Sequence, residues 1–137
     1  MALPGSSTYI ILQEFKKVLI SFVDELIGQF PKEADFVILR IFLKDQSQVL
    51  KIMNDFVRKL LPLKQKVVDR NEEFFLNSDS LFEQFSRNKV NHFKRLWRAP
   101  TLDDEDKNVI WSWFDSFIYL AEKYSNATLA NCTKKQN

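Results

Sequence analysis

Residues that interrupt helices are scarce in this chain. Two glycines, Gly5 and Gly28, and four prolines occur among its 137 residues. A multi-stranded sheet needs many tight turns, and glycine and proline are among the residues that most often form them. The chain is also long enough to bury one hydrophobic core. We therefore predict an all-α fold, a single compact bundle of about five to seven helices joined by short connections.

The spacing of apolar residues predicts where these helices lie. Over residues 8–29 they recur at three- and four-residue steps, which is typical of an amphipathic helix. Segment 33–44 is apolar on nearly all sides. We interpret it as a central helix rather than a buried strand, because no second strand-like segment is present to pair with it. The other predicted helices cover 45–60, part of 63–76, a short stretch from Ser80 with Glu83 at capping-box spacing, 87–98, and 101–124 with Thr101 as N-cap.

Aromatic side chains dominate the predicted interior. The core is expected to contain Phe15, Phe22, Phe36, Phe42, Phe56, Trp97, Trp113 and Phe117. One domain is predicted over 1–124, followed by a polar, flexible tail over 125–137.

Single copies of cysteine and histidine limit the covalent and metal chemistry of the chain. Cys132 and His92 stand alone, so one chain can form neither an internal disulfide nor a Cys/His zinc cluster. The first fifteen residues contain only four consecutive apolar residues, at 9–12, which is too short for a signal-peptide core. No stretch is apolar over eighteen residues. We expect no membrane insertion and a location in the cytoplasm or nucleus.

Catalytic patterns are not found in the sequence. His92 has no carboxylate three or four residues away on its helix, and Asp103 to Asp106 are consecutive acids that suit a helix start better than a calcium loop. Two glycines are too few for a phosphate-binding loop. We expect no enzyme activity, cofactor or metal. An enzyme whose site is built between subunits is an alternative that this pattern does not remove.

The predicted helix at 87–98 has two distinct faces. Its cationic face combines five polar residues within an arc of roughly 100°: Arg87, Asn91, Lys94, Arg95 and Arg98. Val90, Phe93 and Trp97 lie on the opposed flank. The cationic face can lie across phosphates, or it can be a solvated face that pairs with the acids of the next helix. The net charge of +2 does not by itself imply a polyanionic partner.

The last predicted helix is aromatic over a wide arc. Most of its rings are expected in the core, but Trp111 or Tyr119 can remain outside and contribute to an interface, where such residues often contribute most of the binding energy. Asp115 lies among these rings. Because an unpaired carboxylate there would be costly, we expect Asp115 to pair with Arg95 or Lys123.

Three strings together carry a resemblance to a known group of proteins. They are RNEEFFL at 70–76, NHFKRLW at 91–97, and LDDEDK at 102–107 followed by WSWFDSF at 111–117 and Tyr124. They resemble strings in small all-helical proteins encoded by large nucleocytoplasmic DNA viruses of protists and algae. The likeness covers roughly residues 10–124. It implies a setting in viral infection, in the host cytoplasm, the nucleus or the virus particle, but no biochemical activity.

Taken together, these features predict a non-enzymatic interaction or scaffold protein of a virus that binds a protein partner through the hairpin 87–124. Self-association is a further expectation from its aromatic residues. The predicted interaction surface consists of Arg87, Asn91, Lys94, Arg95, Arg98, Trp111 and Tyr119. The alternative is a nucleic-acid-associated protein of viral transcription or genome packaging, in which the cations of 87–98 contact phosphates.

Overall fold

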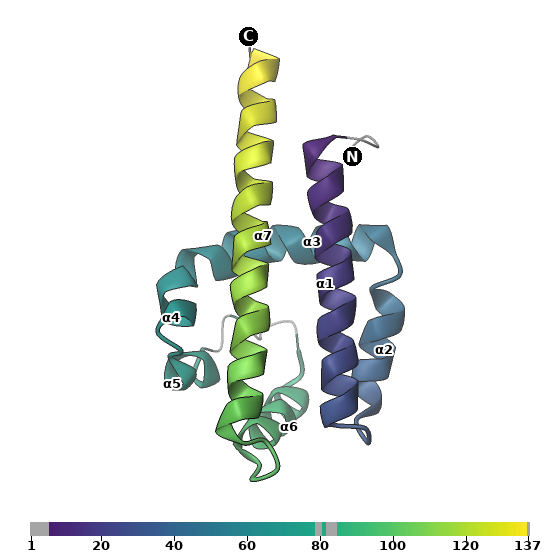
Figure 1. Cartoon of the computed structure of the whole chain (residues 1–137), viewed down its shortest axis with the longest axis vertical. Coiled ribbons are helices and arrows are strands. Elements are labelled where there is room, and N and C mark those ends of the chain that lie inside the picture. Colours follow the sequence, from purple (N-terminus) through teal and green to yellow (C-terminus); the bar gives the residue numbers. More distant parts are fainter. Residues whose placement is uncertain (1–5, 79–80, 82–84, 137) are drawn as a thin grey trace.

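The computed structural model describes residues 6–78, 81 and 85–136, with side chains to residue 130, and over these residues it contains helices and no strand (Figure 1). The predicted all-α class is confirmed. Two long antiparallel helices, α1 (Ser7–Gln29) and α7 (Asp104–Gln136), run side by side through the molecule, and the shorter helices are arranged around them.

Helix α1 begins and ends where the sequence predicts. The Ser6 hydroxyl caps it by accepting a hydrogen bond of 3.1 Å from the backbone N–H of Tyr9. After Gln29 the chain turns at Phe30 and Pro31, because the residue before a proline avoids the helical region. Helix α2 (Ala34–Phe42) then returns along α1, so the strand interpretation of this segment is excluded.

Helix α3 (Gln46–Asp55) crosses behind the long pair (Figure 1). Asp45 caps it by accepting from the N–H of Ser47 at 3.0 Å. The helix does not stop cleanly before Pro62. It continues through a π-helical turn (Phe56–Leu60) and a 3-10 turn (Leu61–Leu63), which accommodate the missing N–H of the proline, and leads into α4 (Lys64–Val68).

Two short helices and one longer helix complete the periphery. Segment 63–76, predicted to hold a short helix, contains α4 and α5 (Glu72–Leu76), and Arg70 between them adopts a left-handed backbone conformation with φ of 53°. Helix α6 (Arg87–Arg98) has the predicted bounds. The predicted capping box of Ser80 and Glu83 lies outside the described residues.

The predicted N-cap of α7 was wrong by two residues. Asp103, not Thr101, caps the helix, since Asp103 Oδ1 accepts from the N–H of Asp106 at 2.8 Å and Asp106 Oδ2 accepts from the N–H of Asp103 at 3.2 Å. This reciprocal pair is a capping box, and it satisfies two helix-end donors. At its other end α7 runs to Gln136, and Ala127 still packs against the core. The predicted flexible tail from Ser125 stays a prediction.

Two hydrophobic clusters hold the helices together. The larger joins α1, α2, α3 and α7 around the fully buried Phe15 and Phe117, with Phe22, Phe56 and Trp113 packed against it. The smaller joins Leu60, Val67, Trp111 and Ile118, with Trp97 packed against it. Every predicted core aromatic except Phe42 therefore belongs to one of these clusters.

Phe42 is the exception because α2 is peripheral rather than central. Only Phe36 of α2 is buried, together with Leu43 just after the helix, and both lie against the larger cluster. Phe42 is 53% exposed, and most apolar residues of this helix face outward with it. A helix that is apolar on nearly all sides is expected to be enclosed, and α2 is covered on one side only.

No helix in the described part of the chain combines the length and the apolar character needed to cross a membrane.

We predict that Phe117→Ala lowers the free energy of unfolding by about 3–4 kcal/mol, because it opens a cavity where four other aromatic rings meet. Phe117 is 1% exposed and contacts the rings of Phe15, Phe22, Phe56 and Phe114. Urea unfolding followed by circular dichroism measures the change. Tyr119→Ala is the matched control on the same helix, and its effect should stay within about 0.5 kcal/mol. Equal effects of the two changes would contradict this description of the core.

Candidate functional site

Helix α6 positions the cationic face that the sequence analysis singled out. Ser86 caps the helix by accepting from the N–H of Lys89 at 3.2 Å. Arg95 and Arg98 lie in the last turn, where the helix dipole favours positive charge. The whole cationic face is therefore carried on one regular, capped element.

The opposite flank of α6 is fixed to three other helices. The Phe93 ring stacks on Phe36 of α2, with 5.8 Å between centroids and 16° between planes. Trp97 meets Trp111 of α7 edge to face at 5.8 Å, and its indole Nε1 donates a hydrogen bond to Glu72 of α5. These contacts set the direction in which the cationic face points.

Two polar contacts add to this attachment, and sequence reasoning missed both. His92 Nε2 lies 2.8 Å from Glu33 Oε2, at the start of α2, and Lys89 Nζ lies 3.7 Å from Asp35 Oδ1. Helix spacing relates His92 only to residues three or four positions away on its own helix. Its partner Glu33 lies 59 residues away in the sequence. Only the packing of α6 on α2 brings these groups together.

The cationic face itself points to solvent. Arg87, Asn91, Arg95 and Arg98 are exposed and Lys94 is half-buried. None of its four cations has an ion pair among the described residues. No ion pair between described residues joins these cations to the acids at 103–106, of which Asp103 and Asp106 cap α7 and Asp106 also accepts from Gln29. Within the described residues, the face therefore carries positive charge without a direct ion pair.

The two predicted aromatic members do not join this face. Trp111 is 8% exposed and packs among Trp97, Phe75 and the guanidinium of Arg70, so its assignment to a surface was wrong. Tyr119 is 60% exposed, with Lys123 Nζ 5.2 Å from its ring centroid. It follows Trp111 by about two turns of α7. Helix α6 lies near the start of α7 (Figure 1).

Asp115 pairs with a residue that the sequence analysis did not consider. Its carboxylate receives two hydrogen bonds from Arg70, at 2.7 and 2.6 Å, and not from Arg95 or Lys123. The left-handed backbone at Arg70 turns this side chain toward α7, and its Nη1 also donates to the carbonyl of Val67. The hydrogen bonds from Arg70 lower the pKa of Asp115, and those to Asp115 raise the pKa of Arg70.

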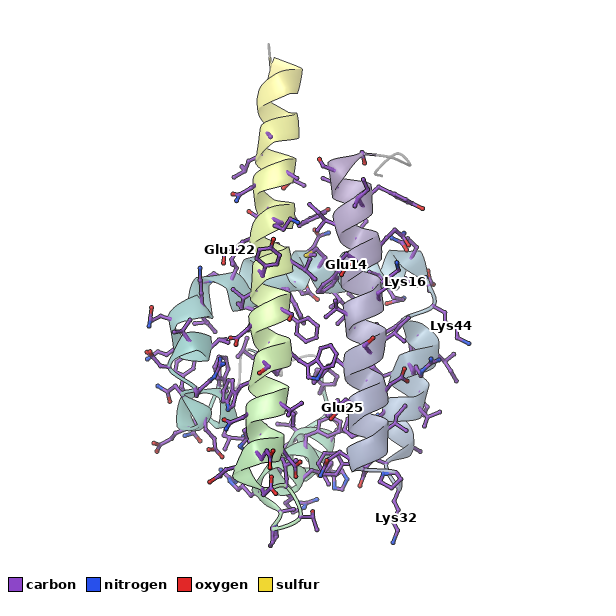
Figure 2. All side chains as sticks on the ribbon, in the orientation of Figure 1. Glu14, Lys16, Glu25, Lys32, Lys44 and Glu122 are labelled. Atoms are coloured by element: carbon purple, nitrogen blue, oxygen red, sulfur yellow. The ribbon has the colours of Figure 1, made fainter. Side chains whose placement is uncertain are left out.

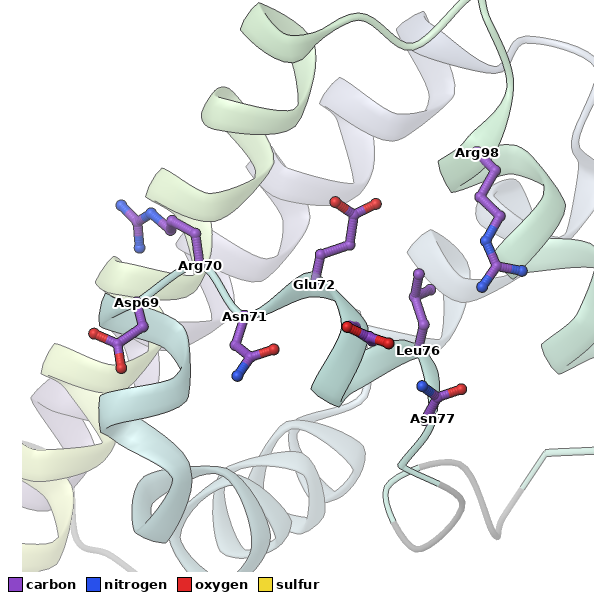
Figure 3. A pocket seen from close by; sticks show the side chains of 8 residues that line it. Asp69, Arg70, Asn71, Glu72, Leu76, Asn77 and Arg98 are labelled. Atoms are coloured by element: carbon purple, nitrogen blue, oxygen red, sulfur yellow. The ribbon is translucent and has the colours of Figure 1, made fainter.

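A polar hollow of about 550 Å³ lies next to the end of the cationic face (Figure 3). Its described lining comes from 69–73, Leu76, Asn77 and Arg98. Arg98 extends from α6 toward α5, whereas Arg70 points away toward α7 (Figure 3). The carboxylates of Asp69, Glu72 and Glu73 line the same hollow as Arg98, one cation of the face. The hollow therefore presents both hydrogen-bond donors and acceptors.

In the described part of the chain, no group of three or more His, Cys, Asp or Glu residues could hold a metal ion.

Comparisons with protein-family models, with curated proteins and with solved structures found no match to this chain.

We predict that Asp115→Asn lowers the free energy of unfolding by about 0.5–1 kcal/mol at neutral pH, a small effect because the pair is partly exposed. The folded-state pKa of Asp115 is lowered below its ordinary value of 3.8. The stabilisation is therefore fully present above that value and is lost as the pH falls through the lowered pKa. Urea unfolding of both proteins from pH 7 to pH 2 should show the difference vanish.

Glu14→Gln provides the control for this titration, because Glu14 is exposed and has no ion pair among the described residues. Its difference from wild type should stay small throughout. A difference for Asp115→Asn that persists unchanged to the lowest pH would contradict the pairing with Arg70.

Proposed function

We propose that this chain is a non-enzymatic interaction protein that binds an acidic surface of a protein partner through the cationic face of α6. The observation that carries this proposal is the set of four cations on one helix face that have no ion pair within the described part of the chain. Their charge forms no ion pair within the described part of the fold. It is available to a partner.

The attachment of α6 supports a binding role for this face. Two contacts on the side of α6 opposite the cationic face fix the helix: Phe93 stacks on Phe36, and Trp97 donates a hydrogen bond to Glu72. A pre-oriented surface loses less conformational entropy on binding than a mobile one. Arginine supplies forked donors that match carboxylates, and complementary charge mainly increases association rate and orientation.

The proposed setting is viral infection, in the host cytoplasm, the nucleus or the virus particle. Its support is the resemblance carried by 70–76, 91–97 and 102–117. Strings 70–76 and 91–97 include the contacts that fix α6, since Glu72 accepts from Trp97. The resemblance therefore extends to the residues that orient the proposed binding face.

A nucleic acid is the second candidate partner. The same face combines arginine, lysine and Asn91, which are residue types that commonly contact phosphates. Four cations would release only about three to four counterions, so such binding should be weak, and its affinity should fall with salt in proportion to that number.

The test of protein binding compares two variants that lose the same charge. Arg95→Gln/Arg98→Gln removes two cations of the α6 face, and Lys17→Gln/Lys51→Gln removes two exposed cations from α1 and α3. Tagged full-length proteins are recovered from nuclease-treated extracts of the cells that express the chain. We expect the first variant to retain at least about tenfold less partner than wild type, and the second to match wild type. Equal recovery by both would contradict the proposed role of α6.

Fluorescence anisotropy with a 20-base-pair DNA duplex and with a single-stranded RNA tests the second candidate. If phosphates are the ligand, log K should fall with log salt at a slope of about −3 to −4 for four contacts. The Arg95→Gln/Arg98→Gln variant should reduce that slope by about two. If neither probe binds at 50 mM salt, the nucleic-acid candidate is rejected.

A further inference from the structure

Helix α2 carries the most concentrated exposed apolar surface in the described part of the chain. Val37, Ile38, Ile41 and Phe42 follow one another at helical spacing, and each is between 46% and 62% exposed. Leu39 on the same helix is 39% exposed. The other large exposed apolar residues lie outside α2 and are farther apart in the sequence: Ile10, Val68, Phe85, Val109, Tyr119 and Leu129. Single exposed residues are ordinary on protein surfaces, whereas a contiguous patch indicates an interaction site.

We propose that this α2 face is the contact between two copies of the chain. The two α2 helices pack antiparallel across a two-fold axis near Ile38. The proposal concerns a surface different from the cationic face of α6 and does not depend on what α6 binds.

Charges at the two ends of α2 favour a second copy in this orientation. Lys32 and Glu33 precede the helix, and Lys44 and Asp45 follow it. Around a two-fold axis between Ile38 and Leu39, residues whose numbers add up to 77 face each other. Lys44 then meets Glu33 of the second copy, and Lys32 meets Asp45. A parallel arrangement would instead place each lysine beside its own equivalent.

Lys32, Lys44 and Asp45 are exposed, and Glu33 is half-buried. Lys32 and Lys44 extend from opposite ends of α2 (Figure 2), and neither amine has an ion pair among the described residues. His92 contacts Glu33 through Oε2, and Ser47 contacts Asp45 through Oδ1, so one oxygen of each carboxylate has no contact with these partners. Antiparallel helices also place opposite dipole ends together.

The side of α2 that packs against the rest of the molecule holds the apolar face in position. Phe36 and Leu43 are buried against the larger cluster, and Arg40 Nε lies 2.6 Å from Asp24 Oδ1 of α1. A specific interface buries at least about 1,000 Å² in total, which requires roughly 500 Å² from each copy. The largest apolar patch on a typical monomer is about 300–600 Å², so one such patch supplies an interface near that lower limit. A dimer formed through the α2 face is therefore expected to be weak.

Sedimentation velocity of the full chain over a concentration series tests the dimer. We expect wild type to dimerise with a Kd in the micromolar range, about 1–100 µM. Ile38→Asp should weaken dimerisation at least about tenfold because it buries a charge at the axis. Val109→Asp is the control, since Val109 is also exposed but lies on α7. Circular dichroism confirms that both variants keep their helical content.

Two outcomes overturn the proposal. The first is that the wild-type chain stays a monomer up to about 0.5 mM, even if that monomer binds anionic phospholipid vesicles through this face. The other is a dimer that Ile38→Asp leaves intact, because that dimer must use another surface.

Cysteine cross-linking with copper–phenanthroline tests the orientation, in a background where the single cysteine is replaced by Cys132→Ser. A disulfide needs Cα atoms about 4.4–6.8 Å apart. Ile38→Cys should cross-link to itself. Ala34→Cys alone should not, but a mixture of Ala34→Cys and Phe42→Cys chains should. Self-linking of Ala34→Cys would indicate parallel helices and overturn the proposed arrangement, as would the absence of both expected cross-links.

Discussion

The edge-to-face packing of phenylalanine rings between α1 and α7 is the interaction on which the rest of the structure depends. Phe117 meets Phe15 at 6.0 Å and Phe22 at 5.3 Å, with interplanar angles of 80° in both pairs. Phe56, at the end of α3, contacts Phe15 and Phe117 and so ties the crossing helix to the same point. Such ring pairs add directional preference to hydrophobic burial. They set how the two long helices meet and where the others can dock.

Helices α2 and α6 dock at the edge of this core and use only part of their surface in doing so. A few contacts on its buried side hold each helix in place. The stacked rings of Phe36 and Phe93 join the two helices to each other. The outward faces that remain differ in chemistry, because one is apolar and the other is cationic. We propose that the core supports these two faces and that each face binds a partner.

Local sequence patterns predicted the helices well, because apolar spacing and capping act over a few residues. The bounds of α6 and the core positions of Phe15 and Phe117 follow from such patterns. Pairings between distant segments did not follow. The contact of Arg70 with Asp115 spans 45 residues and depends on a left-handed turn that no local pattern indicated. The exposure of α2 was missed for the same reason, because periodicity shows that a helix is apolar but not how much of it neighbours cover.

The claim that α2 presents a binding face, rather than a poorly covered part of the core, is tested most directly by hydrogen–deuterium exchange at two protein concentrations. Exchange of the wild-type chain is compared at a low and a high concentration, peptide by peptide. The account predicts that the higher concentration slows exchange in Ala34–Phe42 and leaves the other helices unchanged. Exchange that is independent of concentration, or slowed mainly in another helix, would contradict it.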